Sequence, residues 1–268
     1  MISALAAALD RSDTPFAICS IGRDGEASDA VDAAPKPSLF LHPGVFLATA
    51  AALVPRSPAL EIVALTGERS ALGPIVLARV RAAGSFELAG PPSAAALRRI
   101  ACALGSDERL VLIDGAVDRT AALRDGGDAI IVAVGAATAS AMSRAVDEVA
   151  ALTKRLQLPL VDTARDAVRI SGALTPGLAA AYARAGERRQ IVVADPTQVT
   201  LRGRTFLELA ARLDLRCEKT LHVVACTVAP IARERSFEPR AFARAVALRT
   251  GLPTFDVYAG SVAEPSAA

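Results

Sequence analysis

The sequence contains no tryptophan and only two tyrosines, and its charged residues are scattered rather than gathered in blocks. Proteins that bind single-stranded nucleic acid stack the bases on aromatic side chains, and nucleic-acid binding in general depends on a basic surface. The 30 basic and 28 acidic residues leave a net charge of only +2. The sequence therefore predicts a protein that does not bind nucleic acid.

Cysteine and histidine are scarce, and a long apolar segment is missing. The cysteines show no C-x-x-C spacing, and neither of the two histidines lies at the spacing of a zinc ligand. We therefore expect reduced thiols and no metal site. No run of about 18 apolar residues occurs, and the N-terminus lacks the features of a secretory signal. These absences predict a cytoplasmic protein that does not contact membranes.

The residues that are present favour an α/β fold. Hydrophobic residues, chiefly small aliphatic ones, make up 52% of the 268 residues, which is enough for a substantial core. In the stretch from Arg109 to Gly135, two apolar runs (Leu110 to Ile113 and Ala129 to Val134) show no polar alternation. Such runs are typical of strands that helices cover on both faces. We expect this stretch to form the middle of a mostly parallel sheet.

Apolar runs alternate with helical patterns along the whole chain, which predicts mostly parallel sheets flanked by helices. Residues Val45 to Leu53 are rich in alanine and predict a helix, and Arg79 to Leu88 predict a hairpin around Gly84. The stretch from Gln157 to Asp166 is the expected boundary between two halves. We predict an N-terminal α/β domain of residues 1–156 and a second, smaller α/β domain of residues 157–268.

Polar residues follow several of the expected strands. In α/β proteins, ligands bind at the carboxyl ends of the strands, where such residues meet. Gly22 and Gly25 flank one pair of acids and would let the backbone approach a ligand closely. The candidate ligand-binding residues are Asp24, Glu26, Asp114, Gly115, Asp118, Arg119 and Asp195.

Each candidate also has a purely structural interpretation. Asp114 could hold a magnesium ion through water, or it could cap the following turn. Arg119 could clamp a carboxylate or phosphate, or it could pair with Asp118. Asp24 and Glu26 could lie in a solvated turn, and Asp195 precedes a proline, which commonly opens a turn. The residues alone leave these alternatives open.

The motifs of common catalytic classes are missing. The stretch from Thr66 to Pro74 is rich in glycine, but it lacks the G-x-x-x-x-G-K order of a phosphate-cradling loop. No G-x-S-x-G elbow occurs, and His42 has no recognisable acid or nucleophile as its partner. We name no catalytic residue, and ATP with magnesium is the one cofactor candidate.

Several stretches together resemble a family of bacterial accessory proteins. They are SIGRDGEASDAV (Ser20 to Val31), FLATAAAL (Phe46 to Leu53), FELAGP (Phe86 to Pro91), VLIDGAVDR (Val111 to Arg119), IVAVGAA (Ile131 to Ala137), VVADPT (Val192 to Thr197) and the closing pattern LHVVACTVAP to LPTFDVYAG. This family is found beside the adenosylcobalamin-dependent lysine 5,6-aminomutase and ornithine 4,5-aminomutase, often with a MutS-like ATPase. The resemblance implies a helper that reactivates the aminomutase by exchanging damaged cobalamin at the expense of ATP.

The order of elements at the N-terminus suggests a more specific fold. An expected helix at Ile2 to Leu9 and a strand from Phe16 resemble P-loop proteins of the dethiobiotin-synthetase type without their first strand and phosphate loop. This resemblance implies a degenerate nucleotide-binding fold with weak or no ATPase activity.

Three functional hypotheses follow from the sequence. The leading one is an accessory or reactivating protein that acts by binding partner proteins. The alternative is an enzyme, a nucleotide-dependent small-molecule transferase or ligase that uses Asp24, Asp114 and Arg119 around a magnesium-bound anion. The third is an oligomeric scaffold, in which the acids are only caps.

Overall fold

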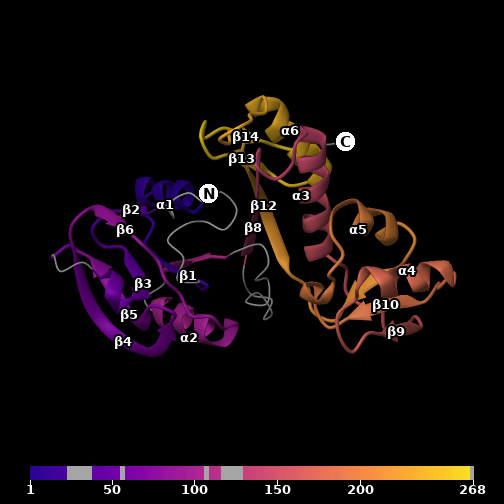
Figure 1. Cartoon of the computed structure of the whole chain (residues 1–268), viewed down its shortest axis with the longest axis horizontal. Coiled ribbons are helices and arrows are strands. Elements are labelled where there is room, and N and C mark those ends of the chain that lie inside the picture. Colours follow the sequence, from indigo (N-terminus) through magenta and orange to yellow (C-terminus); the bar gives the residue numbers. More distant parts are fainter. Residues whose placement is uncertain (23–37, 55–57, 106–108, 116–128, 266–268) are drawn as a thin grey trace. The chain divides into compact units, whose positions relative to one another are not determined.

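The computed structural model describes residues 1–22, 38–54, 58–105, 109–115 and 129–265. The chain divides into two compact units, an N-terminal unit of Ile2–Ala122 and a C-terminal unit of Leu123–Ala268. Figure 1 shows the elements of the N-terminal unit in indigo to magenta and those of the C-terminal unit in rose to yellow. Both units combine helices with sheets, as expected for an α/β protein.

The N-terminal unit is built on a mixed sheet of five strands in the order β4-β5-β3-β1-β7. Strand β1 lies between β3 and β7 and runs parallel to both, whereas β5 is antiparallel to β3 and β4. A separate antiparallel pair joins β2 to β6. The elements are α1 (Ile2–Arg11), β1 (Phe16–Ser20), β2 (Leu39–Leu41), β3 (Phe46–Ala50), the 3-10 helix η1 (Ala51–Leu53), β4 (Leu60–Ser70), β5 (Gly73–Val80), β6 (Gly84–Phe86), α2 (Ala94–Leu104) and β7 (Leu110–Asp114).

Two apolar clusters cover the two faces of this sheet. The alternate residues of β1 point to opposite faces. On one face Ala17 and Cys19 pack with Leu97 and Ile100 of α2, and Ser93 caps that helix by accepting a hydrogen bond from the Ala96 amide. On the other face Ile18 packs in a cluster that includes residues of α1, β2 and β6. Strand β1 is therefore buried along its whole length.

The C-terminal unit contains two further sheets. One has the order β14-β13-β12-β8, with β12 parallel to β8 and β13 and with β14 antiparallel, and the other is the parallel sheet β11-β10-β9. The elements are β8 (Ala129–Gly135), α3 (Met142–Leu156), β9 (Ala167–Arg169), α4 (Pro176–Arg184), β10 (Gln190–Val193), the 3-10 helix η4 (Pro196–Gln198), α5 (Gly203–Ala210), β11 (Leu215–Cys217), β12 (His222–Ala229), α6 (Pro239–Thr250), β13 (Thr254–Asp256) and β14 (Val262–Ala263).

Helix α3 joins the two sheets of this unit. Its residues Val146 and Val149 pack with α6 on the sheet of β12, while Ala151 belongs to the cluster formed by α4, α5 and the sheet of β10. Arg155 adds hydrogen bonds to the carbonyls of Val199 and Leu201, both at 3.2 Å. The division of the chain into compact units falls between residues 122 and 123, and the predicted boundary after residue 156 lies at the C-terminal end of α3, inside the second unit.

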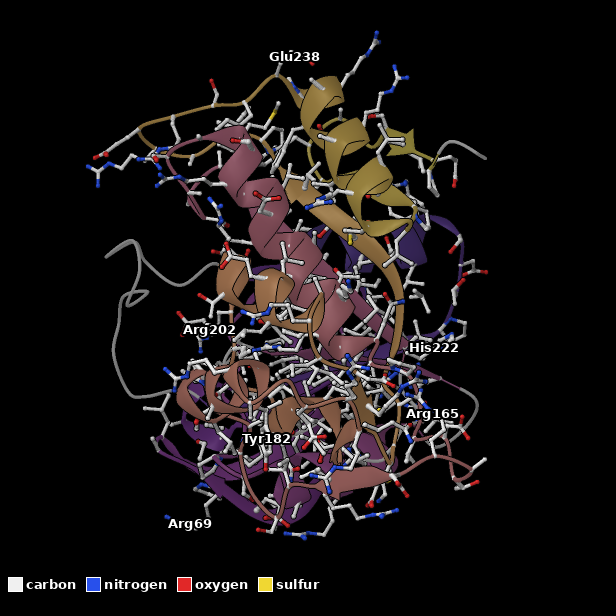
Figure 2. The ribbon with its side chains drawn as sticks, turned by 90° about the vertical axis from the view of Figure 1, so that its right-hand side faces the viewer. Arg69, Arg165, Tyr182, Arg202, His222 and Glu238 are labelled. Carbon is white, nitrogen blue, oxygen red and sulfur yellow. The ribbon has the colours of Figure 1, made fainter. Side chains whose placement is uncertain are left out.

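Helix α6 shows how local sequence sets the limits of an element. Glu238, labelled in Figure 2, precedes a proline at the first helical position, and its carboxylate accepts hydrogen bonds from the amides of Arg240 and Ala241. The helix ends at Gly251, whose φ of 71° is the left-handed conformation that glycine adopts at low cost.

The expectation of a helix over residues 45–53 is wrong. Residues Phe46–Ala50 form strand β3, and only Ala51–Leu53 turn into a 3-10 helix. Alanine favours helices only weakly compared with tertiary pairing. Here β1 and β5 pair with β3 on its two edges, and Leu47, Ala48 and Ala50 are buried. An apolar run without alternation fits this central position in the sheet.

Two other expectations need correction. Strand β6 does not form a hairpin with the strand before Gly84, because it pairs instead with β2, over forty residues earlier in the chain. The stretch from Arg109 to Gly135 is not the middle of one sheet, because β7 and β8 lie at the ends of two different sheets. The sheets are also more mixed than the mostly parallel arrangement that the sequence predicts.

Burial, which the sequence suggested for the cysteines, holds for three of them. All four are free, with Cys19, Cys217 and Cys226 buried and Cys102 exposed. Among the described residues, no helix is both long and apolar enough to cross a membrane.

Candidate functional site

The carboxyl ends of β1 and β7 form the edge at which the sequence placed Asp114. The two strands are in parallel register, with Ser20 opposite Asp114, and the amide of Ile21 donates a hydrogen bond to the Asp114 carbonyl at 3.0 Å. The carboxyl ends of β1 and β7 therefore lie side by side. We call the ends of β1 and β7, Ser20–Gly22 and Asp114–Gly115, the Asp114 edge.

A loop between β6 and α2 crosses this edge at close range. The amide of Gly22 donates a hydrogen bond to the Pro91 carbonyl at 2.8 Å. A Cβ atom at Gly90 would lie 1.5 Å from the Ser20 carbonyl oxygen, so only glycine fits there. The backbone is therefore held against the end of β1.

Thr49, at the end of β3, fixes the same loop from the other side. Its buried hydroxyl donates to the Glu87 carbonyl at 2.9 Å and accepts from the Ala89 amide at 3.1 Å. Since β3 runs parallel to β1, its carboxyl end lies at the same edge. Hydrogen bonds thus tie the carboxyl ends of β1, β3 and β7 and this loop together at one edge of the sheet.

The environment of Asp114 disfavours negative charge. Partial burial raises the pKa of the Asp114 carboxyl above its ordinary value. Burial, together with a smaller contribution from the Asp114 charge, raises the pKa of the neighbouring Cys19 to about 12. Cys19 is therefore a protonated core thiol at neutral pH rather than a nucleophile.

The sequence named further residues for this edge. Asp24, Glu26, Asp118 and Arg119 lie outside the described residues. Asp114 and Gly115 lie together at the edge, and Gly115 is exposed there. Their role in ligand binding stays a prediction.

Asp195 lies elsewhere, in the C-terminal unit, where it caps the 3-10 helix η4. Its carboxylate accepts hydrogen bonds from the amide and the hydroxyl of Thr197, the former at 2.9 Å. Burial, with a smaller contribution from the Asp195 charge, raises the pKa of Cys217 to about 11. The turn interpretation accounts for this geometry, and Asp195 and Asp114 belong to different compact units.

The glycine-rich stretch from Thr66 to Pro74 does not form a phosphate loop. It continues β4 and turns tightly into β5. The Thr66 hydroxyl accepts from the Glu68 amide, and the Ser70 hydroxyl accepts from the Leu72 amide. The amides of Glu68 and Leu72 therefore already donate to side chains of the same stretch and are not available to a phosphate. This stretch does not fit ATP.

His42 has a partner that the sequence did not reveal. Its Nε2 lies 3.5 Å from an oxygen of Asp10, and its ring packs edge-on against Phe40 with centroids 5.3 Å apart. Asp10 and His42 line a hollow of about 350 Å³ together with Ser3 and Ser38. Asp10 and His42 lie 32 positions apart, on α1 and after β2, so no sequence motif could have joined them.

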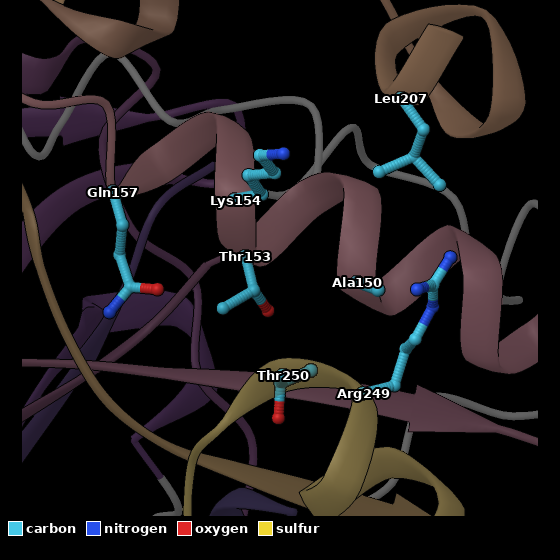
Figure 3. Close-up of a pocket in the computed structure, with 7 residues that line it drawn as sticks. All are labelled: Ala150, Thr153, Lys154, Gln157, Leu207, Arg249 and Thr250. Atoms are coloured by element: carbon cyan, nitrogen blue, oxygen red, sulfur yellow. The ribbon is translucent and has the colours of Figure 1, made fainter. Parts of the chain in front are cut away.

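A second hollow of about 430 Å³, shown in Figure 3, lies among α3, α5 and α6 of the C-terminal unit. Its lining residues carry no motif spacing and come from three separate helices, so the sequence alone gave no signal for them. Among the described residues, no three His, Cys, Asp or Glu side chains lie together as a metal site.

Comparison with known proteins leaves the family open. No protein-family model, curated protein or solved structure matches this chain. The fold thus defines an α/β protein of two compact units.

Proposed function

We propose that this chain is an accessory protein that acts by binding a partner protein, and that strand β4 is its docking element. The observation that carries the proposal is the exposure of large aliphatic side chains on this strand. Ile62 is 49% exposed, Val63 is 53% exposed and Leu65 is 80% exposed. Leaving three such side chains in water on one strand is unfavourable unless another surface covers them.

The backbone of β4 supports the same proposal. The strand has 11 residues, and in the part of the chain that the structure describes it pairs with β5 alone. An edge strand with free amides and carbonyls is a template on which an extended segment of another protein can add as a further strand. We take an extended segment of the partner as the occupant of this edge.

Two features favour a specific partner over self-association. The register of β4 shifts between Ile62 and Ala64 and again between Leu65 and Arg69, and such irregularities limit open-ended strand pairing. The acids of the strand are already paired, Glu61 with Arg81 at 2.5 Å and Glu68 with Arg99 at 2.7 Å. Contact would therefore rely on the aliphatic side chains and the backbone.

The resemblance of the sequence names the partner. It implies an adenosylcobalamin-dependent lysine 5,6-aminomutase or ornithine 4,5-aminomutase, assisted by a MutS-like ATPase. In this role the chain would help to restore an aminomutase whose cobalamin is damaged. The ATP would be used by the ATPase, since the described part of this chain offers no phosphate loop.

The test is binding of the purified chain to a purified aminomutase, followed by biolayer interferometry. We expect a saturable complex with the wild type and an affinity at least about tenfold lower for Leu65→Glu, because a charge would be buried in the contact. Leu248→Glu is the matched control, since Leu248 is 53% exposed on α6 and should leave affinity unchanged. Failure of the wild type to bind, or equal loss in both variants, would refute the proposal.

A second candidate function rests on Asp114. A partly buried carboxyl at the parallel ends of two strands is where a transferase would hold a magnesium-bound anion. A rise in melting temperature with MgATP that Asp114→Asn abolishes would favour this enzyme. A MgATP effect that is absent, or that the variant retains, would leave partner binding as the function.

A further inference from the structure

The hollow among α3, α5 and α6 has the size of a small-molecule site. Its volume of about 430 Å³ falls within the range of about 300–1,000 Å³ that such sites occupy. Ala150, Thr153 and Lys154 line it from one face of α3, and Gln157, the residue that follows this helix, continues the same spacing. Its other lining residues are Leu207 of α5 and Arg249 and Thr250 of α6.

The lining is positively charged. Lys154 and Arg249 contribute two cations from different helices, and none of the described residues that line the hollow is acidic. Arg249 makes one long contact, 3.5 Å to Asp147, and both of these side chains are about half exposed. In the described chain Lys154 has no ion pair. The two cations therefore remain available to an incoming anion.

Polar groups on the floor add hydrogen-bonding capacity. Thr153 is buried, and its hydroxyl has only a weak contact at 3.9 Å with the thiol of Cys226. The Gln157 amide donates to the Val223 carbonyl at 3.3 Å through its nitrogen, which directs its side chain toward β12. Thr250 is already used, since its hydroxyl donates to Val246 and accepts from Leu252. Of the two threonine hydroxyls on the floor, that of Thr153 is thus the one that can donate a hydrogen bond to a ligand.

Figure 3 shows how these groups lie. Thr153 points from α3 toward Thr250, and Arg249 extends from α6 toward α3. Ala150 carries only a methyl group, which keeps the space beside Arg249 open. Lys154 and Arg249 lie in the last turns of α3 and α6, where cations also interact favourably with the helix dipoles. That interaction would explain the two cations, but it would not explain the hollow between the helices or the polar groups on its floor.

We propose that this hollow binds a small metabolite that carries a carboxylate or phosphate group. Lys154 and Arg249 pair with the anion, Thr153 donates a hydrogen bond to it, and Ala150 and Leu207 contact its apolar part. The site belongs to the C-terminal unit, whereas β4 and the Asp114 edge belong to the N-terminal unit.

Calorimetric titration of the full chain with citrate, pyrophosphate and inorganic phosphate, at constant ionic strength, tests this proposal. We expect at least one of these probes to bind with a stoichiometry near one. The double variant Lys154→Ala with Arg249→Ala should weaken binding by about tenfold or more, because charge-assisted hydrogen bonds are lost. The Ala150→Met variant should abolish binding of the probe, because the longer side chain fills the hollow without changing its charge.

The control is the double variant Lys219→Ala with Arg240→Ala, which removes the same charge from exposed positions of the same unit. It should bind as the wild type does, and melting curves without ligand should show that every variant is folded. Absence of binding by all three probes overturns the proposal. Equal weakening by the control pair, or binding retained by a folded Ala150→Met variant, overturns it as well.

Discussion

Gly90 is the residue at which the backbone of the N-terminal unit tolerates least change. A Cβ atom there would meet the Ser20 carbonyl oxygen at 1.5 Å, and the nearest atoms that it would meet all belong to the main chain. We predict that Gly90→Ala destabilises the protein by about 3 kcal/mol or more, because β1 and the loop must separate.

Gly115 provides the control for this prediction. It lies at the same edge, where a Cβ would meet only a methyl group of Ile21 at 4.0 Å. Urea unfolding should show a large loss for Gly90→Ala and a change of less than about 0.5 kcal/mol for Gly115→Ala. Similar midpoints for the two variants would contradict the close approach at Gly90.

Asp114 makes the stability of the fold depend on pH. Its folded pKa lies above the ordinary value of 3.8, so between these two values the folded state binds more protons than the unfolded state. Stability contributed by this group is present at acid pH and is lost as the pH rises through that window. We predict that Asp114→Asn, which cannot ionise, gains stability relative to the wild type from pH 3 to pH 7. Chemical unfolding at several pH values measures this difference, and a constant difference would contradict it.

Helix α6 offers a prediction about a whole element. The helix ends at Gly251, which has a left-handed conformation and whose amide donates to the Ala247 carbonyl at 2.9 Å. Gly251→Ala should cost about 1 kcal/mol, because a Cβ strains that conformation. Gly177 lies near the start of α4 with open space around it, so Gly177→Ala should be neutral or stabilising. Thermal unfolding of the two variants would separate them, and equal melting temperatures would argue against the cap.

The elements themselves show what the sequence could predict. Helix α2 was readable because Ser93 is a local cap, and β1 and β7 because an apolar run followed by a polar turn is a local pattern. Strand β3 could not be predicted in this way. Its residues suit a helix in isolation, and only their pairing with β1 and β5 makes them a strand. The partner of β6 was hidden for the same reason, because pairing over forty positions leaves no local trace.

The candidate sites follow the same division. Asp114 was found because strand ends can be recognised in sequence and neighbouring parallel strands bring their ends together. The pairing of His42 with Asp10 and the presence of Lys154 and Arg249 in one hollow depend on tertiary packing, and their sequence spacings carry no signal. Asp195 was found at a strand end, but the local geometry that suggested a site is that of a cap.

At the scale of the whole molecule, the apolar core is divided in the same way as the chain, with separate clusters in the two compact units. The two clusters around β1 contain residues up to Leu112 and Ile113, and the two clusters of the C-terminal unit begin at Ile130. In the described chain no cluster spans residues 122 and 123, so each unit has a core of its own. Each is also larger than the roughly 40 residues below which a single core rarely suffices.

We therefore predict that fragments 1–122 and 123–268 each fold when they are expressed separately. Circular dichroism and urea unfolding should show a cooperative transition for each fragment. A cut after residue 156 should fail instead, because it removes Ala151 and Arg155 of α3 from the unit that they stabilise. Cooperative folding of fragment 157–268 would contradict this account.

The distribution of the cysteines also has a practical consequence. Three of the four thiols are shielded in the core, and Cys102 on α2 is exposed. A maleimide dye should therefore attach at one position of the native N-terminal unit without prior mutagenesis. A second dye on an engineered cysteine of the C-terminal unit would turn the chain into a fluorescence energy-transfer ruler that reports any movement between the units when a partner or a small anion is added.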